Sequence, residues 1–387
     1  MRKIRLGIVG IGNMGSGHSR NLSDGKVPEI ELSAVCDINP QRLDWAVKNL
    51  PETVEKFDNA SKMFNSGLID AALIATPHYL HPPMVMEALG CDLHVMSEKP
   101  AGVYTKQVRE MNEAAAKSNK VFGLMYNQRT DHIFRKMKEL VSSCELGAIK
   151  RTNWIVTSWY RPQAYYDSGS WRATWAGEGG GVLINQCPHN LDLWQWICGM
   201  PVKVRAFCHE GKWHDIEVED DVTAYVEYDN GATGVFITTT ADAPGTNRFE
   251  ITLDGGKMVC EDGELHLYRL EMNEREFNRI NKASFGSPKY VHEIVETDGQ
   301  SPGHVGVLQQ FAGAILRGEP LVANGCEGIN GLLISNAIHL SAWLDRTITF
   351  PLDEDVYYRE LNKRVSKSKL KPDGISIVAD TAGSYNL

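Results

Sequence analysis

Residues 4–15 read Ile4-Arg5-Leu6-Gly7-Ile8-Val9-Gly10-Ile11-Gly12-Asn13-Met14-Gly15, an apolar run that leads into three spaced glycines. The apolar part, Ile4–Gly10, predicts a buried strand. Asn13–Leu22, which follows the glycines, predicts a helix that begins at the turn. The chain therefore starts with a strand, a glycine turn and a helix.

The three glycines match the pattern G-x-G-x-x-G. Gly10 permits the tight turn, Gly12 lets the backbone approach a pyrophosphate, and Gly15 lets the helix pack on the strand. The N-terminus of the helix, with Asn13 and Met14, would stabilise the phosphate charge. We predict a dinucleotide-binding turn here, against the alternative of a glycine turn without a ligand.

An acidic residue ends the next predicted strand, Glu31–Asp37. Asp37 would hydrogen-bond the hydroxyl groups of the adenosine ribose and repel a 2′-phosphate, which favours NAD over NADP. Arg42 follows closely and could instead meet a 2′-phosphate. The use of NADP therefore stays open.

Strands and helices continue to alternate up to residue 126. This alternation predicts an α/β Rossmann domain, a doubly wound parallel sheet, over residues 1–126. The further segments are the strands Asp70–Thr76, Leu93–Ser97 and Val121–Tyr126 and the helices Pro82–Leu89 and Lys106–Lys117.

The pattern changes after about residue 148, where strand pairs joined by short turns appear. An Asn-Gly turn between two alternating runs is the strongest short hairpin signal, and it predicts an α+β domain over residues 127–352. The predicted strands are Ile149–Trp159, Val222–Tyr228, Ala232–Thr240, Phe249–Leu253, Lys257–Cys260 and His266–Leu270, and the predicted helices are Gly303–Arg317 and Cys326–Leu344. The polar C-terminal extension, residues 353–387, is predicted to be an extended arm, either solvated or laid on a neighbouring subunit.

Composition excludes several classes of function. The net charge is −9 without a long basic tract, which disfavours nucleic acid and anionic membranes as partners. The eight cysteines form no C-x-x-C pair, so we expect reduced thiols, no metal site and a cytoplasmic location. The N-terminus leaves no room for a signal peptide before the first strand, and no apolar stretch is long enough to span a bilayer.

Two segments follow predicted strands of the parallel sheet. Lys99, in Glu98-Lys99-Pro100, lies at the carboxyl end of the strand Leu93–Ser97, where ligands of such sheets bind. Thr76-Pro77, with His81 beyond them, follows the buried strand Asp70–Thr76, where the second half of the nucleotide should pass. The alternative for this loop is a proline-ended turn with surface histidines.

The densest group of polar and aromatic residues runs from Trp171 to Trp196. Five residues, Gly177–Gly181, form a flexible glycine-rich approach to a predicted helix. Asn185, His189 and Asp192 are spaced i, i+4 and i+7, which would put all three on one helix face and make a pocket wall. A histidine satisfied within the core is the alternative for His189.

These motifs occur together and in order, and the chain resembles the Gfo/Idh/MocA oxidoreductases over roughly residues 4–350. The resemblance rests on the glycine turn, Thr76-Pro77…His81, Glu98-Lys99-Pro100, Tyr126-Asn127-Gln128-Arg129 and Gly179-Gly180-Gly181…Asn185…His189…Asp192. It implies a C-terminal domain built on an open, mainly antiparallel sheet. It also implies a homo-oligomer, a dimer or tetramer, that assembles through this sheet.

The resemblance also implies roles for single residues. Lys99 matches the catalytic lysine of the family and His189 its catalytic histidine, while Asn185 stands where many members have aspartate. His189 would be the general base, and Lys99 would stabilise the negative charge that develops on the same oxygen. Asn185 would orient the substrate. The residues expected near the nicotinamide are Glu98, Lys99, Asn127, Trp171 and Arg172.

The expected reaction is hydride transfer to NAD from a secondary hydroxyl of a sugar, glycoside or cyclitol, for example C3 of a glucoside or a hydroxyl of an inositol. Two alternatives stay open, an NAD-dependent glycosidase with transient oxidation and a non-catalytic sugar sensor. No phosphate-binding cluster appears beyond the nucleotide turn, which favours a neutral substrate over a sugar phosphate. The residues expected to bind substrate are Lys99, Tyr160, Tyr165, Asn185, Gln186 and His189, although the aromatic residues would equally suit a subunit interface.

Overall fold

The computed structural model describes residues 3–371. Its first sheet is parallel, with the strand order β3-β2-β1-β4-β5-β6, and the strand order reverses between β1 and β4, where open α/β sheets bind ligands. The strands are β1 (Ile4–Val9), β2 (Ile30–Cys36), β3 (Glu55–Phe57), β4 (Ala71–Ile74), β5 (His94–Ser97) and β6 (Phe122–Leu124). The predicted doubly wound α/β fold is confirmed.

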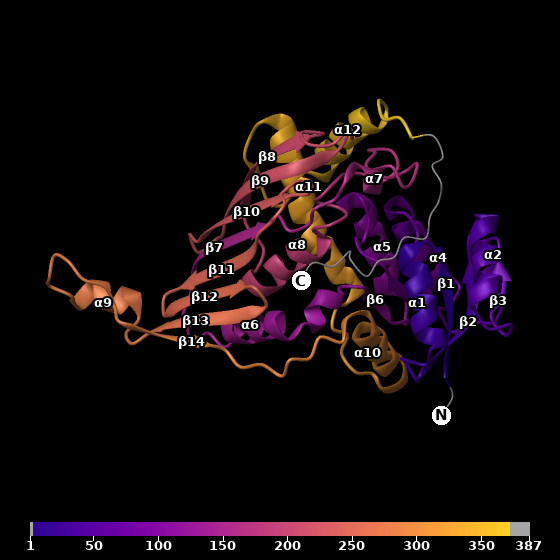
Figure 1. Cartoon of the computed structure of the whole chain (residues 1–387), viewed down its shortest axis with the longest axis horizontal. Coiled ribbons are helices and arrows are strands. Elements are labelled where there is room, and N and C mark those ends of the chain that lie inside the picture. Colours follow the sequence, from indigo (N-terminus) through magenta and orange to yellow (C-terminus); the bar gives the residue numbers. More distant parts are fainter. Residues whose placement is uncertain (1–2, 372–387) are drawn as a thin grey trace.

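Helices cover both faces of this sheet (Figure 1). They are α1 (Asn13–Ser23), α2 (Pro40–Asn49), α3 (Ala60–Phe64), α4 (His81–Gly90) and α5 (Thr105–Lys117). One further helix comes from late in the sequence: Leu308 and Phe311 of α10 (Gly303–Arg317) are buried in the same core as Ile8 of β1. Because α10 belongs to the core of the first domain, this domain is not built from one continuous stretch of the chain. The domain boundaries at residues 126 and 352 stay predictions.

The second sheet is mixed and mainly antiparallel, with the order β14-β13-β12-β11-β7-β10-β9-β8-β15. Among the described strands of this second sheet, only β7 and β10 pair in parallel. The predicted Asn-Gly hairpin is confirmed, because Thr233 pairs with Glu227 across the turn. The strands are β7 (Ile149–Val156), β8 (Lys203–Glu210), β9 (Glu219–Glu227), β10 (Thr233–Thr239), β11 (Asn247–Leu253), β12 (Gly256–Glu261), β13 (Glu264–Leu270), β14 (Tyr290–Ile294) and β15 (Ile348–Thr349).

Helices α6, α8 and α11 lie on the side of this sheet that faces the Rossmann domain, and α9 projects from its far end (Figure 1). The bounds of the helices outside the first domain are α6 (His132–Ser142), α7 (Gln163–Tyr166), α8 (Pro188–Cys198), α9 (Glu274–Ile280), α11 (Gly328–Leu344) and α12 (Glu354–Val365), with short 3-10 turns η1 (His78–Leu80), η2 (Asn127–Thr130) and η3 (Gly325–Glu327). Within residues 3–371, none of the helices has the length and apolar character needed to cross a membrane.

The prediction of an extended C-terminal arm is wrong for its first part, which forms the helix α12. Asp353 caps the first turn of this helix with its side chain, as acidic residues do at helix N-termini. Tyr357 and Leu361, one turn apart, are buried, so the helix has an apolar side that packs on the protein. Residues 372–387 of the predicted arm lie outside the described part of the chain.

Candidate active site

The glycine turn after β1 has the geometry that a nucleotide requires. Gly10 has a φ of +90°, and a Cβ there would lie 2.5 Å from the carbonyl oxygen of Ala75. A Cβ on Gly15 would lie 1.8 Å from the carbonyl oxygen of Gly10, so the helix can approach the turn only without a side chain. A Cβ on Gly12, by contrast, would have no described atom within 4 Å, which leaves this side open to a ligand.

The acid at the end of β2 is fixed against this turn. Oδ2 of Asp37 accepts the backbone N–H of Ile11 at 2.7 Å, and Oδ1 accepts the N–H of Asn39 at 2.8 Å. The neighbouring Ile38 side chain is 88% exposed, and the sequence reading did not single it out. Arg42 lies in the first turn of α2 and is half-buried. An acid for the ribose and an apolar surface for a base therefore stand together at this edge.

The loop after β4 combines one open polar group with one occupied side chain. The Thr76 hydroxyl is buried and has no hydrogen-bond partner among residues 3–371. In His81, by contrast, Nδ1 lies 2.7 Å from the carbonyl oxygen of Pro100 and Nε2 lies 2.7 Å from that of Thr76. We therefore correct the prediction for His81: its ring ties the loops after β4 and β5 together and presents no free nitrogen to a cofactor. Pro77 leads into η1.

Glu98 is buried in a cluster that the sequence reading missed. His18 of α1 approaches it, with Nε2 2.7 Å from the carboxylate, and the ring of His304 on α10 lies 5.3 Å from the ring of His18. Burial alone would raise the pKa of Glu98, but the hydrogen bond from His18 and the charges of His18, His304 and Lys99 outweigh it and lower the pKa to about 2. Glu98 is therefore ionised beside Lys99.

Lys99 connects the Rossmann sheet to the segment before α8, residues 174–187, which we call the glycine-rich segment. Its ammonium group donates a hydrogen bond to the backbone carbonyl of Asn185 at 2.8 Å. Burial lowers the pKa of Lys99, the carboxylates of Glu98 and Glu178 oppose this, and the charges of Arg172 and Arg161 add to the lowering. The ammonium is thus held at the boundary between the two domains, as a catalytic lysine would require.

His189 occupies the first turn of α8, directly after Pro188. Its side chain is 2% exposed, and neither ring nitrogen has a hydrogen-bond partner in the described chain. Burial, followed by the charges of Lys99 and His304, places its pKa well below 6.5. At neutral pH the imidazole is therefore uncharged and able to accept a proton.

The predicted helix face is wrong, because α8 begins only at Pro188. Asn185 lies in the irregular segment before it. Asp192 lies on the helix but pairs with Arg129, whose guanidinium makes two bonds of 2.7 Å to the carboxylate. A proline cannot occupy the interior of a helix without loss of a hydrogen bond. The helix therefore starts at Pro188, and of the three predicted residues only His189 and Asp192 lie on it.

Asp192→Ala is expected to lower the free energy of unfolding by about 2–3 kcal/mol, because it removes two charge-assisted hydrogen bonds and, within residues 3–371, leaves the buried Arg129 with the partly exposed Glu327 as its ion-pair partner. Both side chains are 1% exposed, so water cannot replace the lost carboxylate. Urea denaturation followed by circular dichroism would measure the change. The double variant Arg129→Met with Asp192→Leu should recover most of the loss, and a loss below about 1 kcal/mol in the single variant would contradict the assignment.

Glu178 is a second site residue that the sequence reading missed. Its carboxylate is buried, accepts the backbone N–H of Ala173 at 2.5 Å and the side-chain amide of Asn185, and lies 3.7 Å from the guanidinium of Arg172. Burial raises its pKa. The sequence contained one signal for Glu178, a charged residue that stands between two glycines. Asn185 therefore has a buried glutamate as the partner of its side-chain amide.

Tyr165 lies at the centre of a group of hydrogen bonds that includes residues predicted to bind substrate. Its hydroxyl oxygen accepts bonds from Arg172 at 2.6 Å, Asn185 at 3.2 Å and Gln186 at 3.3 Å. The structure thus brings together three of the residues predicted to bind substrate. The ring of Tyr160 is 47% exposed, so this residue lies nearer the surface than Tyr165.

Four of the predicted residues carry buried polar atoms that lack a partner within residues 3–371. They are the Thr76 hydroxyl, the Asn127 Oδ1 oxygen, the Arg172 Nε nitrogen and both ring nitrogens of His189. Trp171 flanks this region, with Arg172 4.7 Å above its ring. Buried polar groups are normally paired, so this concentration marks a place where a bound molecule supplies the partners. A dinucleotide and a polyol fit these residues.

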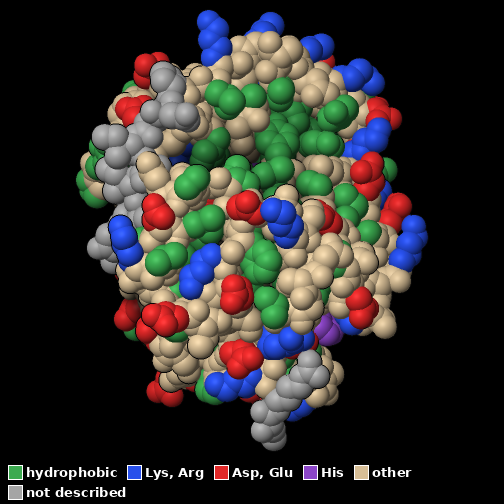
Figure 2. Space-filling view, turned by 90° about the vertical axis from the view of Figure 1, so that its right-hand side faces the viewer, with side chains coloured by type: hydrophobic (Ala, Val, Ile, Leu, Met, Phe, Trp, Pro, Cys, Tyr) green, Lys and Arg blue, Asp and Glu red, His purple; other side chains and the backbone are tan. Residues whose placement is uncertain are grey.

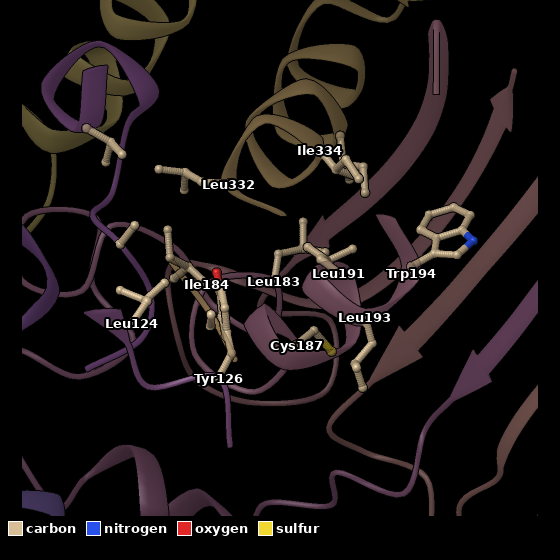
Figure 3. Close-up of a cluster of buried hydrophobic side chains, with 14 of the residues drawn as sticks. Leu124, Tyr126, Leu183, Ile184, Cys187, Leu191, Leu193, Trp194, Leu332 and Ile334 are labelled. Carbon is tan, nitrogen blue, oxygen red and sulfur yellow. The ribbon is translucent and has the colours of Figure 1, made fainter. Parts of the chain in front are cut away.

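An apolar core holds the two domains together at this site. Figure 3 shows Leu124 and Tyr126, at the end of β6, beside Ile184 of the glycine-rich segment, with Leu191 of α8 and Leu332 of α11 beyond them. The ring centroids of Tyr126 and His189 lie 6.0 Å apart. In Figure 2, which faces the Rossmann end, hydrophobic side chains gather around a hollow and charges of both signs are scattered over the rest of that face. In the described chain, no group of three or more His, Cys, Asp or Glu is arranged to hold a metal ion.

The fold and this geometry define the class of Rossmann-fold, NAD-binding oxidoreductases. Residues 4–126 match the family described as oxidoreductase family, NAD-binding Rossmann fold, and residues 134–259 match the GFO/IDH/MocA C-terminal domain. The chain belongs to the Gfo/Idh/MocA family, and the predicted resemblance is confirmed.

Three proteins illustrate the similarity. The rhizopine catabolism protein MocA of Rhizobium meliloti is 28% identical over 200 residues, 51% of this chain and 58% of MocA, so the match spans little more than half of that relative. The myo-inositol 2-dehydrogenase of Thermotoga maritima is 23% identical over 89% of this chain and 98% of its own. The WlbA dehydrogenase of Bordetella pertussis, solved with NADH and UDP-GlcNAcA, is 27% identical with a TM-score of 0.77, covering 91% of this chain and 99% of that one.

Proposed function

We propose that the protein is an NAD-dependent dehydrogenase that oxidises a secondary hydroxyl of a sugar, glycoside or cyclitol. One observation carries the proposal. His189 is a buried, uncharged histidine whose two ring nitrogens have no hydrogen-bond partner among residues 3–371, and it lies in the electrostatic field of Lys99. Such a pair can accept the proton of an alcohol and stabilise the oxygen that remains.

The residues act in the following way. His189 accepts the hydroxyl proton on a ring nitrogen, and the ammonium of Lys99 donates a hydrogen bond to the same substrate oxygen while negative charge develops there. NAD, when bound, supplies the acceptor for the hydride. Glu178 holds Asn185, whose backbone carbonyl in turn holds Lys99. The residues that would hold the cofactor are Gly10, Gly12, Asn13, Met14, Gly15, Asp37, Thr76, Glu98, Asn127, Trp171 and Arg172.

The names of two relatives support the substrate class. One is called a myo-inositol 2-dehydrogenase and the other was solved with a nucleotide-linked sugar acid. Both inositol and the sugar part of the nucleotide-linked molecule are rings that carry hydroxyl groups. Tyr165 and Gln186 offer an aromatic surface and hydrogen-bonding groups of the kind that suit such rings.

Production of NADH tests the proposal. Purified protein with NAD would be assayed against inositols, free aldoses and simple glucosides. NADH formed with one class of substrate establishes a dehydrogenase. Sugar products without net NADH would instead identify a glycosidase that re-reduces its intermediate. Bound dinucleotide without any product would identify a sensor.

Asp37→Ala is expected to weaken NAD binding by about tenfold and to relax the discrimination against NADP, because a charge-assisted hydrogen bond is worth about 1.5–3 kcal/mol and a carboxylate repels a 2′-phosphate. Fluorescence titration with both dinucleotides would measure this. Asp44→Ala, an exposed acid further along α2, is the matched control. An unchanged preference in Asp37→Ala would mean that Asp37 does not bind the ribose.

We also propose that the chain forms a homo-oligomer through the second sheet and works in the cytoplasm. The aromatic side chains of Phe207 and Tyr225 are 54% and 41% exposed on neighbouring strands β8 and β9. Exposed apolar groups of this size favour a protein interface. Light scattering of the purified protein would give the number of subunits.

A further inference from the structure

The described chain ends in a short segment that crosses the substrate side of the site. We call residues 366–371, which follow α12, the C-terminal strap. The hydroxyl oxygen of Ser368 accepts the backbone N–H of Ala176 at 3.0 Å and donates to the carboxylate of Glu217. Glu217 also accepts the backbone N–H of Trp175 at 2.9 Å. Ser368 therefore completes a junction between the strap and the start of the glycine-rich segment.

The end of the strap makes a second set of contacts. The backbone N–H of Lys371 donates to the carbonyl oxygen of Ser170 at 3.1 Å, and its ammonium group donates to the carbonyl oxygen of Tyr166 at 3.0 Å. The ammonium also lies 3.4 Å from the carboxylate of Asp167. The strap thus binds both ends of residues 166–176.

This bound segment belongs to what we call the substrate loop, residues 165–178. The loop carries Tyr165 and Glu178, whose side chains accept hydrogen bonds from the amide of Asn185. It also carries Arg172, which donates to the hydroxyl of Tyr165 and lies 3.7 Å from the carboxylate of Glu178. Most of its backbone is irregular, with only α7 at its start. A loop without a regular hydrogen-bond ladder depends on contacts from outside to hold one conformation.

The other end of α12 is bound to the Rossmann domain. Glu354 pairs with Arg109 of α5, and Asp355 pairs with Lys106 at 2.8 Å. Further along the helix, the guanidinium of Arg364 lies 3.9 Å above the ring of Trp343 on α11. The strap therefore extends from a helix whose position is fixed against both domains.

We propose that the C-terminal strap is a positioning element of the active site, in which Ser368 and Lys371 fix the substrate loop and so place Tyr165, Arg172 and Glu178 around the substrate. The proposal rests on the proposed dehydrogenase function. In the contacts above, the strap touches the loop, which also carries Trp171 and Arg172 of the proposed cofactor site, and it does not touch the glycine turn or Asp37. Its loss should therefore affect the use of the polyol more than the binding of NAD.

Ser368→Ala tests the junction at Ala176. The variant should raise KM for the polyol by about three- to tenfold, the range that corresponds to one or two lost hydrogen bonds, and should change the Kd for NAD by less than about twofold. Ser368→Thr, which keeps the hydroxyl, should restore KM. Ser366→Ala is the matched control, because within residues 3–371 the Ser366 hydroxyl donates to the carbonyl oxygen of Lys363 on α12 and makes no bond to the substrate loop.

Hydrogen exchange gives a readout that does not depend on turnover. Peptides that cover residues 170–178 should exchange faster in Ser368→Ala and in Lys371→Met, and at the wild-type rate in Ser368→Thr, Lys371→Arg and Ser366→Ala. Unchanged exchange in both Ser368→Ala and Lys371→Met, or an equal loss of NAD binding and polyol use, would overturn the proposal. Absence of turnover in the wild-type protein with every polyol would contradict the proposed function instead, and the exchange experiment would still decide the role of the strap.

Discussion

Lys99→Ala is expected to lower kcat/KM by about 10²–10³-fold, the loss that follows removal of one donor to a developing oxyanion. The ammonium of Lys99 stands at the end of β5 and bonds the carbonyl of Asn185, so it faces the segment that leads to His189. None of the groups that hold the glycine turn or Asp37 involves Lys99. NAD affinity should therefore stay within about threefold of the wild type, a difference below about 1 kcal/mol.

Steady-state kinetics and an NAD titration on the same preparation would separate the two effects. Lys120→Ala is a suitable control, because this lysine lies just before the first residue of β6, at the end of the sheet opposite to Lys99. It pairs with Asp92 at 2.9 Å. It should behave as the wild type in both assays. If Lys99→Ala lost NAD binding and turnover to the same extent, the lysine would serve the cofactor and not the substrate oxygen.

His189→Asn is expected to lower kcat by about 10²–10⁴-fold, the usual contribution of a general base. The pH dependence of the wild type gives an independent check. The pKa of His189 lies well below 6.5 because burial disfavours the charged ring. The base is lost only when it is protonated, so kcat/KM should stay level as the pH falls through 6.5 and decline at a lower pH.

The alkaline side has a second expected decline. Burial lowers the pKa of Lys99 below 10.5. As the pH rises, Lys99 therefore loses its proton before pH 10.5 and can no longer stabilise the oxyanion, so kcat/KM should decline.

The acidic decline needs a control, because burial also lowers the pKa of His304 to about 4. His304→Gln should keep the acidic decline. If the acidic decline persisted in His189→Asn and vanished in His304→Gln, the titrating group would be His304, and the assignment to His189 would be wrong.

Much of the first domain could be predicted because its signals are local. The apolar runs that form β1 and β4 are buried on both faces, so composition alone marks them. Gly10 and Gly15 are required by contacts with Ala75 and with each other, and such close approaches leave a fixed spacing in the sequence. The hairpin of β9 and β10 was equally accessible, since an Asn-Gly turn sets the register of its own strands.

The active site was predicted less completely. The spacing of Asn185 and His189 suggested one helix, but Pro188 sets the helix start and separates them. Asp192 has the same local pattern as a pocket residue, and only the position of Arg129, far away in the sequence, shows that it is part of the core. Glu178 gave a weak signal, a charge between glycines, whose meaning depends on its burial.

The tail was misjudged for a different reason. Asp353, followed by acidic residues in the first turn, is a helix start that the sequence does contain. Tyr357 and Leu361 define only a narrow apolar side, however, and a short amphipathic helix becomes stable mainly through the surface on which it packs.

The sequence by itself determined the Rossmann fold, the glycine turn and Asp37 at the strand end, and it led to the proposal that Lys99 and His189 are the reacting pair. These depend on residues that are near one another in the chain or on motifs with fixed spacing. Only the tertiary structure decided that α10 completes the Rossmann core, that Glu178 holds Asn185, that His81 is occupied, and that Ser368 reaches the substrate loop. Each of these is a contact between distant parts of the chain, and its energy exists only after folding has brought the partners together.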